Sequence, residues 1–250
     1  TGGPYIMGLC LSRGMGWQAG YRTISFLQMA LTLILLLSLP LWKKQELPLS
    51  GGETVRPQTP QWGKLLKRPG VKAALTAFFF YSALELTTGL WGSSYMVAVR
   101  GISPETAAKW ISLFYLGITA GRFFSGFLTL RFSDDTMVRL GEGTAIVGII
   151  LLLLPLHNLF LCVGLILTGL GCAPIYPSLL HATPQRFGKS LSQSLMGTQM
   201  AISYLGSTTM PPVSGFLSEK ISMGLYPVLL LVFALCMTIL TEKGRHCTAE

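Results

Sequence analysis

The chain has 250 residues, of which 50% are hydrophobic and only 12% are charged, and its formal net charge is +9. Soluble globular domains carry roughly twice that charged fraction, so the composition excludes a water-soluble globular protein and indicates an integral membrane protein. The positive charge does not indicate nucleic-acid binding, because the cations lie in short loops between apolar segments. That distribution is the ordinary topology signal of a membrane protein.

The apolar segments predict an all-α membrane protein, a bundle of transmembrane helices. A helix needs about 20 apolar residues to cross a bilayer, whereas a barrel strand would alternate over about ten residues. We expect about seven full spans and part of another. The partial span lies at 1–12, and the full spans lie at 20–42, 71–99, 108–130, 138–156, 159–181, 192–217 and 223–241.

One long polar connection, 43–70, divides the spans into two groups. We expect the end of an N-terminal bundle at 1–42, a cytoplasmic central loop at 43–70, a C-terminal six-helix bundle at 71–241 and a cytoplasmic tail at 242–250. With the loop in the cytoplasm, the inner loops hold thirteen Lys and Arg residues and the outer loops five, a clear positive-inside bias. The stretch 61–68 mixes apolar and basic residues, as a short helix on the inner membrane surface does.

Glu85 is the one acidic residue that we place at the middle of a span. An unpaired charge there costs about 2.5–3.5 kcal/mol on insertion scales, so such residues are candidates for function. Tyr81, Glu85, Thr88, Gly92 and Tyr95 recur at spacings of three or four and share one helix face. This polar face fits a water-accessible cavity in which Glu85 carries a proton or binds substrate hydroxyls. The alternative is a structural ion pair or a hydrogen bond between helices.

Other spans hold polar or helix-bending residues. Arg122 could pair with Glu85 or extend to the inner head groups, and its position off the centre of the span favours the second. Pro174 and Pro177 bend the span that holds Tyr176, and bent helices are usual at transport sites. The predicted substrate-binding or proton-coupling residues are Tyr81, Glu85, Thr88, Trp91, Tyr95, Tyr176, Gln199 and Ser203.

The motifs of enzymes and pumps are missing from the sequence. It holds no HExxH, GxSxG, Walker A or GxGxxG pattern, so we expect neither an intramembrane enzyme nor an ATP-driven pump. The five cysteines form no CxxC and have no His at ligand spacing. We therefore expect no disulfide, no metal site and no cofactor.

Several motifs resemble those of the major facilitator superfamily. Gly121-Arg122, Gly126 and Arg131 are similar to its loop motif between the eighth and ninth helices, although Leu130 replaces the usual Asp and Ser133-Asp134 replaces the following Gly-Arg. Residues 173–179 and 206–216 are similar to helices ten and eleven of the fucose:proton symporter branch. The residues that correspond to conformational motifs are Gly121, Arg122, Gly126, Arg131, Pro211 and Gly215.

The resemblance implies a chain that runs from the end of helix five to helix twelve. The opening Thr1-Gly2-Gly3-Pro4, followed by Gly8, is similar to the end of the fifth helix, so we interpret the sequence as a fragment. Glu85, Tyr176 and Gln199 would then lie on helices seven, ten and eleven, which line the cavity in this family.

The function that we predict is secondary active transport of a small solute, such as a sugar, by proton-coupled symport and alternating access. The alternatives are a multidrug or metabolite efflux carrier of the same fold, or a membrane sensor that does not transport. The expected partners are a small-molecule substrate, protons, the lipid bilayer and the missing N-terminal helices of the same protein. We expect a multi-pass protein of the plasma membrane.

Overall fold

The computed structural model describes residues 6, 10, 13–42, 66, 68–155 and 157–249. It divides into two compact units, Thr1–Thr59 and Pro60–Glu250, which we treat separately. The partial span predicted at 1–12 and the surface helix predicted at 61–68 fall mostly outside the described residues.

The first unit consists, in its described part, chiefly of helix α2 (Gly16–Trp42). Residues 18–40 are long and apolar enough to cross a membrane, in agreement with the span predicted at 20–42. Its leucine side chains are exposed within the unit. Lipid or other helices must therefore cover them, because such a face is not stable in water.

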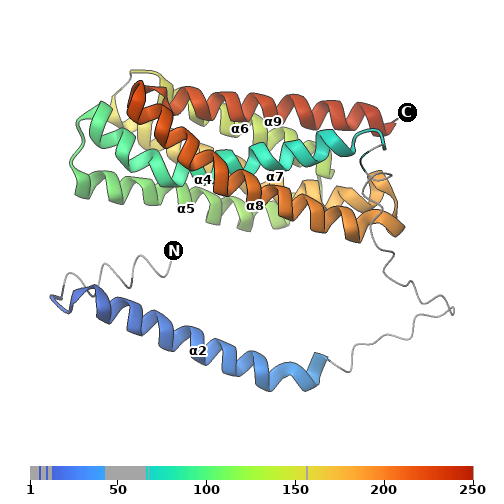
Figure 1. The fold of residues 1–250 in the computed structure, drawn as a ribbon, viewed down its shortest axis with the longest axis horizontal. Coiled ribbons are helices and arrows are strands. Elements are labelled where there is room, and N and C mark those ends of the chain that lie inside the picture. Colours follow the sequence, from blue (N-terminus) through green and yellow to red (C-terminus); the bar gives the residue numbers. More distant parts are fainter. Residues whose placement is uncertain are drawn as a thin grey trace. The chain divides into compact units, whose positions relative to one another are not determined.

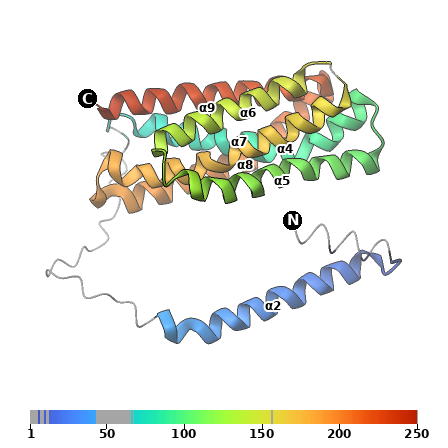
Figure 2. The same ribbon diagram turned by 180° about the vertical axis from the view of Figure 1, so that it is seen from behind.

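The second unit is a bundle of six long helices (Figures 1 and 2). The 3₁₀ turn η2 (Met223–Leu225) precedes the last helix. The described residues contain no strand, which confirms the predicted all-α class. The helices are α4 (Val71–Arg100), α5 (Pro104–Leu128), α6 (Asp134–Leu153), α7 (Asn158–Phe187), α8 (Lys189–Lys220) and α9 (Tyr226–Ala249).

Local sequence explains where these helices begin and end. Ser103 caps α5 by accepting a hydrogen bond from the Thr106 amide, and Pro104 occupies the first helical position, where a missing N–H costs nothing. Ser133 caps α6 in the same way, and two aspartates fill its first turn, where they interact favourably with the helix dipole. Gly101 ends α4 with a φ of 64°, a conformation that glycine adopts without strain.

One predicted span differs in character from the others. Within the described residues, six helices are long and apolar enough to cross a membrane, and α8 is not among them. The helix predicted at 192–217 is present and has 32 residues, but its serines, threonines and Gln199 lower its hydropathy. Its polar side chains suit contacts with other helices, whereas Tyr204, Leu205 and Phe216 are exposed on its outer face.

Small residues bring two helices of the bundle into close contact. A side chain at Gly148 of α6 would collide with Thr168 and Gly164 of α7, and one at Gly171 of α7 would collide with Ala145 of α6. Small residues at such crossings let backbones approach closely, which is a main source of helix association in membranes. The close packing of α6 and α7 therefore fixes the positions of the side chains near the ends of these two helices.

Candidate functional site

A cavity of about 880 Å³ opens between α5, α7 and the start of α6. This volume is within the range of small-molecule sites in proteins. Gly117 and Gly121 press α5 against the backbone of α7 on one side of it, and the helices leave room beyond that contact. The lining residues are Arg122, Ser125, Gly126, Thr129, Asp134, Ala173, Tyr176, Pro177, Ser178 and His181.

Glu85 and Arg122 form an ion pair at this cavity. The distance from Arg122 Nη2 to Glu85 Oε1 is 3.7 Å, and the side chains of Arg122 and Glu85 are 61% and 28% exposed, respectively. The pair is therefore loose and open to whatever fills the cavity. The sequence favoured extension of Arg122 toward head groups, and the structure corrects this, because α5 brings the guanidinium to the carboxylate on α4.

Two tyrosines support the wall next to this ion pair. Tyr176 lines the cavity, and its ring lies 5.7 Å from that of Tyr81 and 5.2 Å from that of Phe78, between centroids. Tyr81 is buried, and its hydroxyl donates a hydrogen bond of 3.1 Å to the Cys172 carbonyl. The structure thus brings Tyr81, Glu85, Arg122 and Tyr176 together. Tyr176 lines the cavity, and Tyr81 is buried beneath it.

The other predicted residues of α4 lie in contacts between helices, away from the cavity. Thr88 donates a hydrogen bond to the Leu84 carbonyl within its own helix. Trp91 Nε1 donates to the Pro211 carbonyl on α8 at 2.8 Å, and the Tyr95 hydroxyl donates to the Leu152 carbonyl on α6 at 3.0 Å. The predicted polar face of α4 therefore does not line this cavity at Thr88 and Tyr95, which are buried between helices. Trp91 is partly exposed and lines a second groove of about 550 Å³.

The polar residues of α8 are also used between helices. Gln199 is buried, and its Oε1 accepts a hydrogen bond of 3.1 Å from Thr183 of α7. Ser203 is hydrogen-bonded to Ser82 of α4. The structure places both residues at helix contacts and neither among the residues that line the large cavity.

The residues of the predicted conformational motifs have different surroundings. Gly121 packs on α7, and Gly126 lines the cavity. Arg131 is exposed and forms no ion pair within the described part of the chain. Pro211 accepts the Trp91 hydrogen bond, and Gly215 leaves space for the Trp91 ring.

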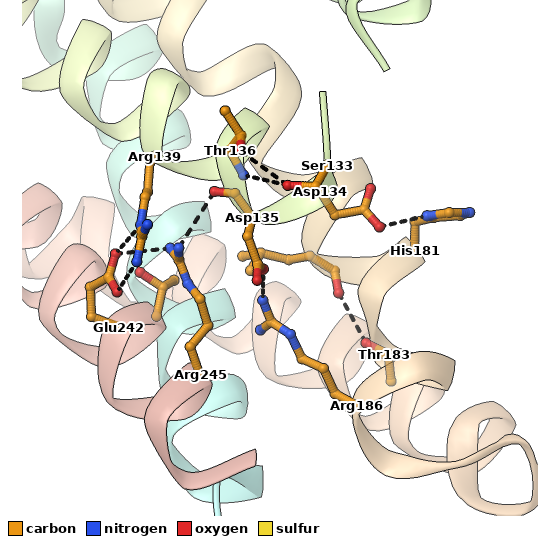
Figure 3. Close-up of polar contacts among 12 residues, drawn as sticks. Ser133, Asp134, Asp135, Thr136, Arg139, His181, Thr183, Arg186, Glu242 and Arg245 are labelled. Atoms are coloured by element: carbon orange, nitrogen blue, oxygen red, sulfur yellow. Dashed lines mark hydrogen bonds and ion pairs between the residues drawn. The ribbon is translucent and has the colours of Figure 1, made fainter. Parts of the chain in front are cut away.

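A network of ion pairs joins the start of α6 to α7 and α9 (Figure 3). Asp134 contacts His181 at 2.8 Å, and Asp135 pairs with Arg186. Both aspartates belong to the first turn of α6, directly after its Ser133 cap. The position where the helix begins therefore also places their side chains next to α7. A signal for this network is present in the sequence, since Asp134 stands where the resembling motif has a basic residue.

On the other side of α6, Arg139 forms a two-pronged pair with Glu242 of α9 through hydrogen bonds of 2.8 and 2.9 Å. Arg245 also contacts Glu242, at 3.1 Å, and its guanidinium reaches the Asp135 carbonyl at 3.5 Å. Sequence reasoning uses these cations only as a topology signal. It misses the Arg139–Glu242 pair because the two residues lie 103 positions apart in the chain, and it does not single out Arg245 and Glu242, which are three positions apart on α9.

Glu142 is a second carboxylate that the sequence does not single out. It is only 1% exposed, and its Oε1 accepts a hydrogen bond of 2.7 Å from Thr241 of α9. Its Oε2 is buried without a hydrogen-bond partner in the described structure. The predicted span 138–156 puts Glu142 near the start of a helix. The observed helix α6 starts earlier, at Asp134, so Glu142 lies inside it.

No three His, Cys, Asp or Glu side chains of the described residues converge as a metal site would require. The polar groups at the cavity are instead hydroxyls, one ion pair and a His–Asp pair. Such a set can bind a polar solute and can respond to changes in charge, since it mixes hydrogen-bond donors, acceptors and ionisable groups.

Comparison with known proteins identifies the family to which this helical bundle belongs. The model of the Major Facilitator Superfamily matches residues 89–244. The chain belongs to this superfamily. Its members are transporters and not enzymes, and the chain is accordingly an integral, multi-pass membrane protein. The resemblance predicted from the sequence is confirmed at the level of the superfamily.

Most of this chain is similar in sequence to part of a yeast protein. Bypass of stop codon protein 6 from Saccharomyces cerevisiae (strain ATCC 204508 / S288c) is 24% identical over 197 residues, which are 72% of this chain and 38% of that protein. This chain therefore spans well under half the length of that relative.

Two crystal structures share the fold of the chain. The E. coli fucose:proton symporter FucP is 20% identical, with a TM-score of 0.59, over 74% of this chain and 44% of that one. FucP in the outward conformation is 18% identical, with a TM-score of 0.69, over 92% of this chain and 54% of that one. At these identities the likeness concerns the fold alone.

Proposed function

We propose that this chain is part of a secondary transporter that carries a small solute across a membrane by alternating access. The observation that carries the proposal is the cavity beside the Glu85–Arg122 pair, found in a bundle of the Major Facilitator Superfamily. Ionisable residues in membrane spans are costly and mark transport pathways in many proteins. The domain plan expected from the sequence, with 71–241 as the C-terminal bundle, is part of this proposal.

The lining of the cavity supports a solute rich in hydroxyl groups, such as a sugar. Ser125, Thr129 and Ser178 line the cavity with hydroxyl oxygens that can accept hydrogen bonds. Ser125 and Thr129 already donate their protons to carbonyls of the same helix. Tyr176 offers a ring against which an apolar sugar face can lie. The fold likeness to a fucose:proton symporter agrees with this class but does not choose a particular sugar.

Proton coupling is assigned to Glu85. If Glu85 takes up a proton, the attraction that holds Arg122 across the cavity is lost, and the guanidinium is free to contact substrate or solvent. The loose 3.7 Å geometry supports such an exchange, because little packing has to be broken. Tyr81 and Tyr176 position this pair, while Thr88, Trp91, Tyr95, Gln199 and Ser203 hold the surrounding helices.

We assign to the ion pairs around α6 the role of holding the helices of the bundle together, so that the bundle moves as one rigid body. They tie α6 to α7 and α9 at the end that the positive-inside bias places in the cytoplasm. Rocking of one helical bundle against another around a fixed site is a common mechanism of secondary transporters. In this proposal the C-terminus is cytoplasmic and the protein lies in the plasma membrane.

Solute uptake by the full-length protein in proteoliposomes tests the proposal. A pH gradient, acidic outside, should increase sugar uptake by the wild-type protein. Glu85→Gln should abolish that increase, because the amide cannot exchange a proton with the Arg122 pair. Glu105→Gln is the matched control, since Glu105 is exposed at the start of α5 and should leave the gradient effect unchanged.

Three results would change the assignment. An unchanged gradient effect in Glu85→Gln would remove Glu85 from proton coupling. Extrusion of drugs or metabolites without sugar uptake would identify an efflux carrier. No movement of any solute tested would favour a membrane sensor, an interpretation consistent with the altered loop motif around Leu130 and Ser133.

A further inference from the structure

A basic groove lies at the end of the bundle where α4 begins and α9 ends. Its volume is about 510 Å³, and its walls come from the residues before α4, the first turns of α4 and the last turns of α9. It is separate from the transport cavity, with which it shares no lining residue. The lining residues are Leu66, Arg68, Pro69, Gly70, Lys72, Ala73, Thr76, Leu240, Lys243 and Cys247.

The helix geometry explains why cations gather there. Lys72 and Thr76 are four residues apart on α4, and Leu240, Lys243 and Cys247 recur at three and four on α9, so each set shares one helix face. Arg68 joins them from the turn before α4. All three cations are exposed.

These cations have no protein counter-charge in the described structure. Arg68, Lys72 and Lys243 form no ion pair with the described residues, whereas Arg139, Arg186 and Arg245 each contact a carboxylate. The sequence contains no acidic residue between Glu53 and Glu85. Glu242, which precedes Lys243, is already paired with Arg139 and Arg245.

The start of α4 adds to the positive potential. No acidic residue lies in its first turn, and Gly70 provides no side-chain cap, although the first turn of a helix favours negative charge. Lys72 stands there instead and opposes the dipole. An anion in the groove would offset both the dipole and the three side-chain charges.

We propose that this groove binds the head group of an anionic phospholipid. The rest of the lining, notably Leu66, Ala73 and Leu240, is apolar and suits the glycerol and upper acyl carbons of a lipid better than a free ion. The groove lies at the ends of two helices that are long and apolar enough to cross a membrane, which is where lipid head groups meet such helices. Basic pockets between transmembrane helices on the cytoplasmic side are known to bind anionic head groups.

Native mass spectrometry of the full-length protein tests this site. The protein would be released from mixed micelles that contain equal amounts of phosphatidylglycerol and phosphatidylcholine, and retained lipid would be counted. We expect the wild-type protein to retain phosphatidylglycerol preferentially. Lys72→Gln/Lys243→Gln should weaken that binding about 25-fold, since each cation near an anionic lipid contributes about a fivefold factor.

The matched control is Lys109→Gln/Lys220→Gln, which removes the same charge from exposed positions at the other end of the bundle and should bind the lipid as the wild-type protein does. Lys72→Arg/Lys243→Arg keeps the charge and should keep the lipid. Thermal unfolding in phosphatidylcholine alone checks that every variant is folded, and Arg68→Gln replaces the double variant if that one is not.

Defined results would overturn the proposal. Equal retention of the two lipids by the wild-type protein would remove the preference for anionic lipid. Equal loss of phosphatidylglycerol in both double Gln variants would reduce it to a general charge effect. Inorganic phosphate that displaces the lipid at millimolar concentration and raises the melting temperature equally would identify a free phosphate site instead.

Discussion

The two carboxylates inside this bundle, Glu85 and Glu142, lie in opposite environments. Glu85 lies beside the cavity, next to the Tyr81 hydroxyl, and makes a loose contact with an exposed arginine that lines the cavity. Glu142 is buried between α6 and α9, where Thr241 donates a hydrogen bond to it. The charged side chains of Arg245, Glu242 and Arg139 lie nearby. The difference separates a group that can change its partner from a group that holds helices together.

The physical basis of the contrast is solvent access. A charge pair in contact with water gains little from its attraction, because water screens it and the side chains lose freedom. A buried charge is costly when it loses its partners. Substitutions near Glu142 should therefore act mainly on stability, and substitutions at Glu85 should act mainly on transport.

The largest effect is expected from Arg245→Met. Its guanidinium is buried beside Glu242 and the Asp135 carbonyl and interacts with Glu142. Glu242 keeps Arg139 after the substitution, but the buried Glu142 loses its cation. We expect a loss of about 3–5 kcal/mol in the free energy of unfolding, measured by denaturant unfolding in detergent. Arg131→Met, at an exposed cation, should change the value by less than about 0.5 kcal/mol; similar losses in both variants would contradict the contrast.

A smaller effect is expected from Thr241→Val. The substitution keeps the size of the side chain and removes the hydroxyl that donates to Glu142 Oε1, which leaves both carboxylate oxygens without a hydrogen bond. We expect a loss of about 1–3 kcal/mol in the free energy of unfolding.

The same substitution tested together with Glu142→Gln sharpens this prediction. The amide that replaces the Glu142 carboxylate is neutral, so its oxygen needs the Thr241 hydroxyl less than a carboxylate does. The double-mutant cycle should therefore give a coupling of about 0.5–2 kcal/mol. Additive effects of the two substitutions would show that the bond contributes nothing specific.

Much of the fold could be predicted from the sequence, because apolar length and turn residues are local signals. The helices α4 to α9 appear at the predicted spans, five of them on continuous apolar runs, and caps such as Ser103 and Ser133 fix where two of them begin. The mid-span position of Glu85 was also visible, since one acid in an apolar run stands out.

Contacts between helices could not be predicted in the same way. The polar residues Thr88, Trp91 and Tyr95 repeat along α4 at helical spacing, but whether a face meets a cavity or a neighbour depends on α6 and α8. Glu142 was missed for a related reason, because its partner Thr241 lies 99 positions away and no local pattern marks the pair.

The smallest effect on stability is expected at the cavity, and it tests the comparison most sharply. Glu85→Gln and Arg122→Gln each remove one side of a pair that is partly exposed, so each should change the free energy of unfolding by less than about 1 kcal/mol. Denaturant unfolding of both single variants and the double variant gives their coupling, which should be about 0.2–1 kcal/mol.

If the coupling instead matched the several kcal/mol expected at Arg245, the pair would be a structural brace like the cluster around Glu142. A small coupling together with lost proton-driven uptake would assign the pair to transport, because a contact that contributes little to folding has then changed the response to a pH gradient. Stability and uptake measured on the same variants therefore separate the two roles that a carboxylate can have inside this bundle.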